Sequence, residues 1–285
     1  MPTMYIRAPD HLGDGVMALP AIHALMALGP VSLEGPPWAK ALYGTHTKGH
    51  PRHDIAVLFK PSFSAAWRAR KCGRRIGVDW DHRGVLLTDR VPAHPGHRVD
   101  EYATIAAAAG AQVEGLPSYT GHAECPVSLP EDFTLLLPMT KSAKTAGWRQ
   151  FKDLARSLSG PVVFAAGPGE EAQLAAIAGA HLQLPALSLP ALAQVARSAR
   201  AVVGNDSGLT HLCAAAIRGA EQDVSKVHVV YGSTDPDRTG PPGTRPHRLA
   251  PLACWPCYKK RCTVASLAPC LEVSMQSVCD AVEAS

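Results

Sequence analysis

The feature that most constrains this chain is a repeated alternation of short apolar segments with longer helical patterns. Strand-like segments buried on both faces are expected to be short, apolar runs, as they are in parallel sheets covered by helices. In the first part we expect strands over 4–7, 31–33, 55–58 and 75–78, and helices over 14–28, 64–72 and 100–111. In the second part we expect strands over 133–137, 162–165, 201–203 and 227–231, and helices over 149–158, 170–178, 189–199 and 209–216.

A loop rich in Gly, Pro and Ser interrupts this alternation over residues 115–130. Such a segment is typical of a domain boundary, and 285 residues suit two domains of about 140 residues each. We therefore predict an α/β protein with two Rossmann-like, doubly wound domains, over residues 1–125 and 126–285. For the last helix, packing back on the first domain is an alternative to packing within the second. In each domain the ligand is expected at the carboxyl ends of the strands, where helix N-termini point.

The composition excludes several other classes of protein. With 46% hydrophobic and 18% charged residues the chain is globular rather than disordered. A net charge of +4, without a run of five like charges, gives no reason to expect a nucleic-acid partner. Charges at Arg7, Asp10 and Asp14 stand where a secretory signal needs an apolar core, and we find no membrane-spanning pattern. We therefore expect a cytoplasmic protein with reduced cysteines.

Two strand-to-helix turns carry groups suited to catalysis and phosphate binding. Gly13 allows a tight turn before Asp14, whose carboxylate is placed at a helix start. That position is also typical of an ordinary carboxylate stabilised by the helix dipole. The turn from Thr140 to Lys144 combines hydroxyls with lysine, as phosphate sites do, but it lacks the spacing of a Walker loop. A solvated lysine loop is the alternative.

Two further turns suggest a nucleotide. Glu170, on the turn after the strand at 162–165, could accept hydrogen bonds from a ribose, or could be an ordinary helix N-terminal glutamate. The strongest signal is 204–211, where the amides of Ser207, Gly208 and Leu209 would face an anion. There, Asp206 and His211 are placed to meet hydroxyls or phosphate. Helix capping alone needs one Asp or Ser, rather than this density of polar groups.

At these residues the sequence resembles glycosyltransferase family 9, the ADP-heptose:lipopolysaccharide heptosyltransferases, and within it the heptosyltransferase II branch. The motifs that carry the resemblance span nearly the whole chain: Arg7–Pro20, Arg75–Asp89, Asn205–His211, Tyr231–Pro236 and Cys254–Cys257. The resemblance implies a GT-B fold with two domains facing across a cleft, the first binding the acceptor and the second the sugar nucleotide. It also implies inverting transfer.

The resemblance assigns roles to individual residues. Asp14 matches the general base and Lys144 the lysine that steadies the donor phosphates. The remaining donor contacts that it implies are Thr140 at phosphate, Glu170 at the ribose, Leu187 at adenine, and Asp206, Ser207, Gly208, Leu209 and His211 at the sugar and pyrophosphate. Positive potential from a lysine and a helix N-terminus can support departure of a diphosphate, so no catalytic metal is required.

Two clusters lie outside those turns. Lys60–Arg75 contains six basic residues and no acid. A solvated helix face is one explanation. The other is a groove for an anionic glycolipid acceptor, or for the inner membrane surface, formed by Arg68, Arg70, Lys71, Arg74 and Arg75. Four of the eight cysteines gather at Cys254, Cys257, Cys262 and Cys270, and this spacing is compatible with structural zinc, disulfides or free thiols.

We therefore predict an inverting glycosyltransferase that moves heptose from ADP-heptose to a lipopolysaccharide inner-core acceptor or a related glycan. The partners expected are a nucleotide-sugar donor, an anionic glycolipid acceptor and, peripherally, the inner membrane. One alternative is a family 9-like transferase with another donor or acceptor. Another is a non-catalytic nucleotide-sugar-binding relative. A Rossmann oxidoreductase is disfavoured, because no Gly-x-Gly-x-x-Gly follows either first strand.

Overall fold

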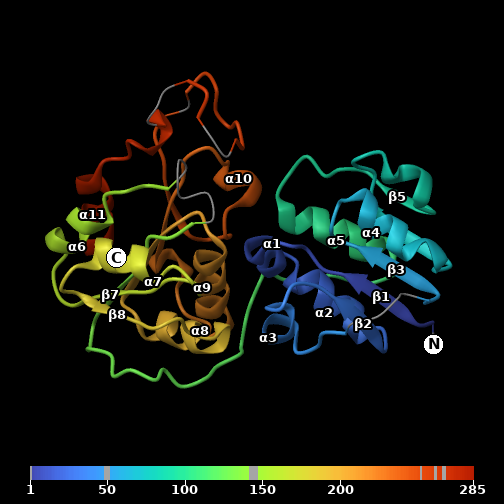
Figure 1. Cartoon of the computed structure of the whole chain (residues 1–285), viewed down its shortest axis with the longest axis horizontal. Coiled ribbons are helices and arrows are strands. Elements are labelled where there is room, and N and C mark those ends of the chain that lie inside the picture. The colour runs from blue at the N-terminus through green and yellow to red at the C-terminus, as the bar shows by residue number, and fades with distance from the viewer. Residues whose placement is uncertain (1, 48–51, 141–146, 251, 260–261, 265–267) are drawn as a thin grey trace. The chain divides into compact units, whose positions relative to one another are not determined.

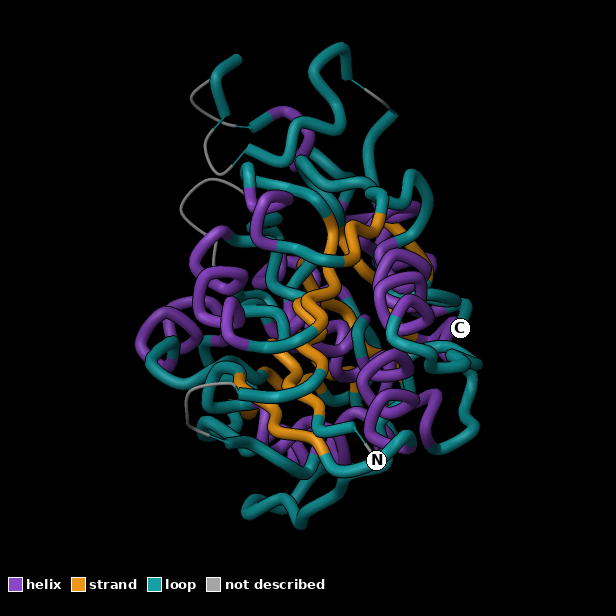
Figure 2. Tube along the Cα trace, turned by 90° about the vertical axis from the view of Figure 1, so that its right-hand side faces the viewer, coloured by secondary structure: helices purple, strands orange, loops and turns teal. Residues whose placement is uncertain are grey.

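The computed structural model describes residues 2–47, 52–140, 147–250, 252–259, 262–264 and 268–285. The chain forms two compact units, Met1–Ser118 and Tyr119–Ser285. This division lies a few residues before the one we drew at 125/126. Each unit contains one parallel sheet with helices on its faces (Figures 1 and 2). The predicted α/β class is therefore confirmed.

The first unit is built on five parallel strands in the order β2-β1-β3-β4-β5. The predicted helix over 14–28 is in fact two helices, which meet at Ala18. Pro20 has no amide hydrogen with which to continue the first helix, so a second begins beside it. The elements are β1 (Met4–Arg7), α1 (Leu12–Met17), α2 (Leu19–Ala27), β2 (Val31–Glu34), α3 (Ala39–Tyr43), β3 (Ile55–Leu58), α4 (Phe63–Arg68), η1 (Ala69–Lys71), β4 (Arg74–Val78), η2 (Arg83–Leu86), β5 (Asp89–Val91) and α5 (Arg98–Ala108).

Arg83 links two of these strands, β3 and β4, through hydrogen bonds inside the first unit. Its side chain is fully buried. It donates to the carbonyl oxygens of Val78 at 2.7 Å, Lys60 at 2.6 Å and Leu58 at 3.4 Å. Because Leu58 and Val78 end β3 and β4, one guanidinium holds the carboxyl ends of both strands and the loop between them. A side chain at Gly77 would collide with this guanidinium, since a Cβ there would lie 2.7 Å from Arg83 Nη2.

The second unit is a six-stranded parallel sheet in the order β11-β10-β9-β6-β7-β8. Its strands are β6 (Thr134–Leu137), β7 (Val162–Phe164), β8 (Leu182–Gln183), β9 (Ala201–Asn205), β10 (Val227–Val230) and β11 (Arg245–His247). Its helices are α6 (Phe151–Ser157), α7 (Glu171–Ala178), α8 (Leu189–Ser198), α9 (Gly208–Gly219), η3 (Val224–Lys226), α10 (Pro236–Thr239), η4 (Pro269–Leu271) and α11 (Met275–Glu283).

The last helix, α11, buries its apolar side in the second unit. Val278, Cys279 and Val282 join one core cluster with residues of α6 such as Leu154. The alternative that this helix packs back on the first domain is not favoured, because its apolar face is covered within its own unit. None of the described helices combines the length and apolarity needed to cross a bilayer.

Strand order creates a topological switch point in each unit, the place where ligands commonly bind in such sheets. In the first sheet the order reverses direction between β1 and β3, and in the second between β6 and β9. Loops that leave neighbouring strands on opposite faces open a crevice at such a point. The loops concerned carry Asp10 and Asp14 after β1, Lys60 after β3, Thr140 after β6 and Asp206 after β9. Both switch points therefore coincide with predicted site residues.

Candidate functional site

Asp14 occupies the first turn of α1, directly after β1. Its Oδ1 accepts a hydrogen bond from the Tyr102 hydroxyl at 2.9 Å and lies 4.0 Å from Nε of Arg98. The carboxylate is 30% exposed, so it is held by the protein and still reachable. Gly15 is required here, because a Cβ would meet the ring of Trp38 at 2.4 Å. Close packing of Trp38 therefore fixes the helix that carries Asp14.

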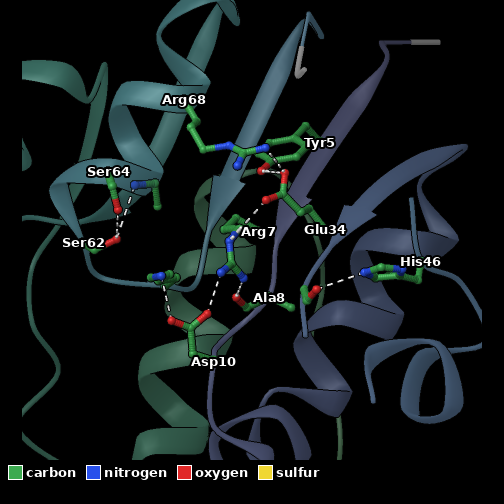
Figure 3. Close-up of polar contacts among 12 residues, drawn as sticks. Tyr5, Arg7, Ala8, Asp10, Glu34, His46, Ser62, Ser64 and Arg68 are labelled. Carbon is green, nitrogen blue, oxygen red and sulfur yellow. Dashed lines mark hydrogen bonds and ion pairs between the residues drawn. The ribbon is translucent and has the colours of Figure 1, made fainter. Parts of the chain in front are cut away.

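A polar network surrounds the carboxyl ends of β1 and β2 (Figure 3). Asp10 pairs with Arg7 at 2.5 Å and with Lys60 at 2.7 Å. These two cations favour the ionised form, so the pKa of Asp10 is lowered even though partial burial alone would raise it. Glu34 accepts from the Tyr5 hydroxyl at 2.9 Å and from Arg68 at 3.0 Å. Five charged side chains and a buried tyrosine thus form a connected polar edge.

The structure divides the basic stretch that the sequence grouped as one groove. Arg68 reaches Glu34 in the network of Figure 3, whereas Arg70 packs over the Trp67 ring, 4.5 Å from its centroid. Arg74 pairs with Asp89 at 2.7 Å, and Arg75 donates to the carbonyls of Leu86, Cys72 and Gly73.

Arg74 and Arg75 begin β4 and Lys71 precedes it, so all three belong to the amino ends of the strands. Lys71 and Arg74 line an open groove of about 680 Å³ there, together with Arg52, His53 and Asp54. The five predicted residues therefore do not line a single groove. Arg68 contacts Glu34 at the carboxyl ends of the strands, whereas Lys71 and Arg74 lie at the amino ends.

In the second unit the loop after β9 is braced by side chains of its own motif. Asp206 lies 3.3 Å from His211 Nε2 through Oδ1 and accepts from the Thr234 hydroxyl at 2.7 Å through Oδ2. Ser207 caps α9 by accepting from the amide of Thr210. His211 is buried, and its Nδ1 has no hydrogen-bond partner in the described part of the chain. The loop thus presents a carboxylate, a histidine and the start of a twelve-residue helix.

Asn205 holds the loop after β6 at both ends. Its Oδ1 accepts from the Trp148 amide at 2.8 Å, and its Nδ2 donates to the carbonyl of Pro138 at 2.7 Å. The segment between them includes Thr140, which is half-buried. The predicted Lys144 lies outside the described residues. Asn205 is itself buried, so the anchoring bonds are shielded from water.

The other predicted donor residues occupy the same edge of the second sheet or its neighbouring loops. Glu170 accepts from the Gly167 amide at 2.8 Å and so closes the turn after β7. Leu187 is half-buried in the loop before α8, and Gly208 and Leu209 form the half-buried first turn of α9. The turn after β7 and the first turn of α9 thus follow two strands of the same sheet. The contact of Leu187 with adenine stays a prediction.

The four clustered cysteines are free thiols in this structure. Burial, followed by the neighbouring Cys257, Cys262 and Cys254, raises the pKa of the Cys270 thiol. Among the described residues no three His, Cys, Asp or Glu side chains come close enough to hold a metal ion. The zinc alternative therefore receives no support from the part of the loop that the structure describes.

Sequence reasoning missed several residues that shape these edges. Tyr102 and Arg98 meet Asp14 from far along the chain, and only the fold could bring them there. Asn205 and Thr234 stand in motifs that the sequence singled out, so their position gave a signal although their partners did not.

Two parallel, doubly wound sheets, each with polar loops at its switch point, define the chain as an α/β protein with the GT-B fold. The chain belongs to glycosyltransferase family 9 (heptosyltransferase), which it matches over residues 49–268.

Individual relatives agree with this family. The chain is 35% identical over 130 residues to lipopolysaccharide heptosyltransferase 1 of Pseudomonas aeruginosa, a match that spans 44% of this chain and only 35% of that protein. The structure of E. coli ADP-heptose lps heptosyltransferase II superposes with a TM-score of 0.76 at 20% identity, covering 99% of this chain and 98% of that one. The structure of E. coli heptosyltransferase WaaC with ADP-2-deoxy-2-fluoro heptose superposes with a TM-score of 0.63 at 19% identity. That match covers 87% of this chain and 93% of that one.

Proposed function

We propose that this protein transfers heptose from ADP-heptose, with inversion, to the inner core of lipopolysaccharide or a related glycan. Membership of family 9 supports the reaction class. The observation that carries the proposal is that each unit has a polar site at its own switch point: a held but reachable carboxylate, Asp14, in the first, and the Asp206–His211 loop in the second.

The proposed reaction needs a base, a leaving-group site and positive potential. Asp14 takes the proton of the acceptor hydroxyl while that oxygen forms the new bond to the anomeric carbon. The bond from this carbon to the diphosphate oxygen breaks, and ADP leaves with the electron pair. Lys144 and the amides at the start of α9 stabilise its charge. Glu170 binds the ribose, Leu187 packs on adenine, and Thr140 contacts phosphate.

For the acceptor we propose the carboxyl-end network, with Arg68 and Lys60 as its cations. Each is already paired with one carboxylate, to Glu34 and Asp10 respectively, and an anionic sugar would share or displace that partner.

The exposed face of α4 is proposed to contact the inner membrane surface. Phe63 and Trp67 are 42% and 51% exposed and stack on each other, and Arg70 covers Trp67. Aromatic rings beside basic groups suit an anionic lipid interface. Sedimentation with vesicles of phosphatidylglycerol should retain the protein, and Trp67→Ser should reduce retention relative to Tyr258→Ser, an exposed aromatic in the second unit. Equal retention of the two variants would contradict this contact.

Product analysis tests the reaction. Purified protein is incubated with ADP-heptose and heptose-free lipopolysaccharide, and ADP release is followed together with the mass of the glycan. Transfer from another nucleotide sugar, with none from ADP-heptose, would identify a different family 9 enzyme. Binding of donor without any turnover would identify a non-catalytic relative.

The proposed chemistry uses no metal cofactor, so turnover should persist after treatment with EDTA. Loss of activity on chelation, restored by one divalent ion, would contradict that part of the proposal. Metal analysis of the untreated protein tests the Cys254–Cys270 cluster separately. Zinc bound there without an effect on turnover would be structural.

A further inference from the structure

We propose that Tyr102 and Arg98, both on helix α5, are positioning residues that hold the Asp14 carboxylate in the orientation needed for proton abstraction. This inference rests on the proposed function, in which Asp14 is the general base. It adds two residues to the reaction that lie far from Asp14 in sequence and that no motif assigns to it.

Tyr102 is held by its surroundings with its hydroxyl directed at Asp14. The side chain is 4% exposed, and its ring meets Phe59 edge to face with centroids 5.6 Å apart. The hydroxyl donates to Asp14 Oδ1 at 2.9 Å. Burial, and next the charge of Asp14, raise the pKa of Tyr102 well above its usual range. The hydroxyl therefore stays protonated and acts as a hydrogen-bond donor.

Arg98 adds a positive charge on the same side of the carboxylate. Its Nε is buried, lies 4.0 Å from Asp14 Oδ1 and has no hydrogen-bond partner in the described part of the chain. The other end of the guanidinium is anchored, since Nη1 donates to Glu101 at 2.6 Å and Glu101 is itself buried. Glu101 thus fixes the direction in which Arg98 Nε points. A small movement of either group would turn this ion pair into a hydrogen bond.

Both contacts fall on one oxygen, which leaves the other for the substrate. Within the described residues Asp14 Oδ2 has neither a hydrogen-bond nor an ion-pair partner. A general base must offer a lone pair within about 3 Å of the proton that it accepts, and misorientation by a fraction of that distance slows the reaction. Tyr102 and Arg98 therefore select the carboxylate rotamer in which Oδ2 is free.

The first test compares Tyr102→Phe with Tyr43→Phe. Tyr43 is equally buried and donates its hydroxyl to the carbonyl of Gly15, next to Asp14 but not to the carboxylate. Both variants lose one buried hydroxyl hydrogen bond, so similar drops in Tm are expected. We expect kcat to fall at least about ten-fold only in Tyr102→Phe, while KM for the donor stays within about two-fold of the wild-type value. Equal kcat values in the two variants would overturn the proposal.

The pH dependence of kcat separates positioning from loss of packing. Removing a donor from an ionised carboxylate disfavours that form, so the acidic limb of the profile should move to higher pH in Tyr102→Phe and not in Tyr43→Phe. Arg98→Met should shift the limb in the same direction, and Arg98→Lys should restore part of kcat because it keeps the charge. Unshifted limbs in both Tyr102→Phe and Arg98→Met would overturn the proposal.

Asp14→Asn separates this inference from the function on which it rests. If Asp14→Asn lowers kcat at least about a hundred-fold while Tyr102→Phe leaves it unchanged, the base is right and the positioning role is wrong. If Asp14→Asn turns over at the wild-type rate, the proposed mechanism itself fails. Donor binding should be retained in every variant, because the donor residues belong to the other unit.

Discussion

At the scale of single residues, Asn205 joins the strand β9 to the loop after β6, for which we propose a part in donor binding. Replacing it with Ala leaves the Trp148 amide and the Pro138 carbonyl buried without their partner. We expect Asn205→Ala to lose about 2–3 kcal/mol of stability and to bind ADP more weakly, as measured by urea unfolding and calorimetry. Ser207→Ala, which removes a helix cap and a contact with the Thr210 hydroxyl, should lose about 1 kcal/mol of stability. A donor affinity unchanged in Asn205→Ala would show that the loop needs no such anchor.

A second residue-scale prediction concerns pH. His228 is fully buried, with Nδ1 3.0 Å from His247 Nε2. Burial, and then the charges of His247 and Arg245, lower the pKa of His228 from 6.5 to about 3, and the pKa of His247 is lowered too. Below about pH 6.5 the unfolded chain binds protons that the folded chain excludes, so stability is complete above that pH and falls towards about pH 3.

For His228 alone the loss between about pH 7.5 and about pH 5 should be about 2 kcal/mol. Urea unfolding at the two pH values measures it. His228→Leu should flatten the dependence, whereas His122→Gln, at an exposed position, should leave it unchanged. Equal slopes in His228→Leu and the wild type would contradict this source of acid sensitivity.

How far the sequence could identify these residues depends on what each one contacts. Asp14 and Asp206 could be predicted because each stands in a turn with a local pattern. Tyr102 could not, since it is an ordinary apolar position of α5 until the fold sets its hydroxyl against a carboxylate 88 positions away. Asn205 falls between the two cases, because its place after a strand is visible and its two backbone partners are not.

At the scale of elements, the buried central strands were predictable, whereas most of the edge strands were not. β1, β3, β6, β9 and β10 are short, mostly apolar runs, and the expected bounds differ from the observed ones by at most two residues. Three edge strands were missed, namely β5, β8 and β11: β8 has two residues, and β11 contains a proline, which an edge strand tolerates. The fourth edge strand, β2, was expected over 31–33. Residues Arg245–His247 form a strand because they pair with β10, and their own sequence shows no strand pattern.

Arg83 provides an element-scale prediction, since it ties the carboxyl ends of β3 and β4. Burial, opposed by Asp79 and Asp81, lowers its pKa to about 10, so it remains charged at neutral pH. Arg83→Met leaves the carbonyls of Val78 and Lys60 without a donor. We expect a loss of about 3 kcal/mol, measured by urea unfolding. Arg90→Met, which removes an exposed cation 3.5 Å from Asp79, should cost less than about 1 kcal/mol. Similar losses in the two variants would contradict the strand-tying role.

At the scale of the whole molecule, the restart of the strand–helix alternation after residue 130 was enough to predict two units. The distribution of charge over the surface was harder to predict from the sequence. Lys60–Arg75 is one basic run in sequence, but β4 starts within it, so Arg68 turns to the network around Glu34 while Arg74 borders the groove at the amino ends. A continuous run of charge therefore does not imply a continuous surface when a strand begins inside it.

The division into two units also makes the proposed roles separable by a single experiment on the whole chain. ADP binds, on our proposal, at the second switch point, so hydrogen exchange should slow in the loops after β6, β9 and β10. It should not change in residues 10–14 or 59–62 of the first unit.

The size of the effect can also be predicted. If ADP binds only the native state and is present at a hundred times its Kd, exchange that requires unfolding of the second unit should slow by an amount equivalent to about 2.7 kcal/mol. AMP, which lacks the second phosphate, is the matched control and should protect the loop after β9 less. Protection confined to the first unit would reverse the assignment of donor and acceptor, because each unit has its own sheet and its own switch point.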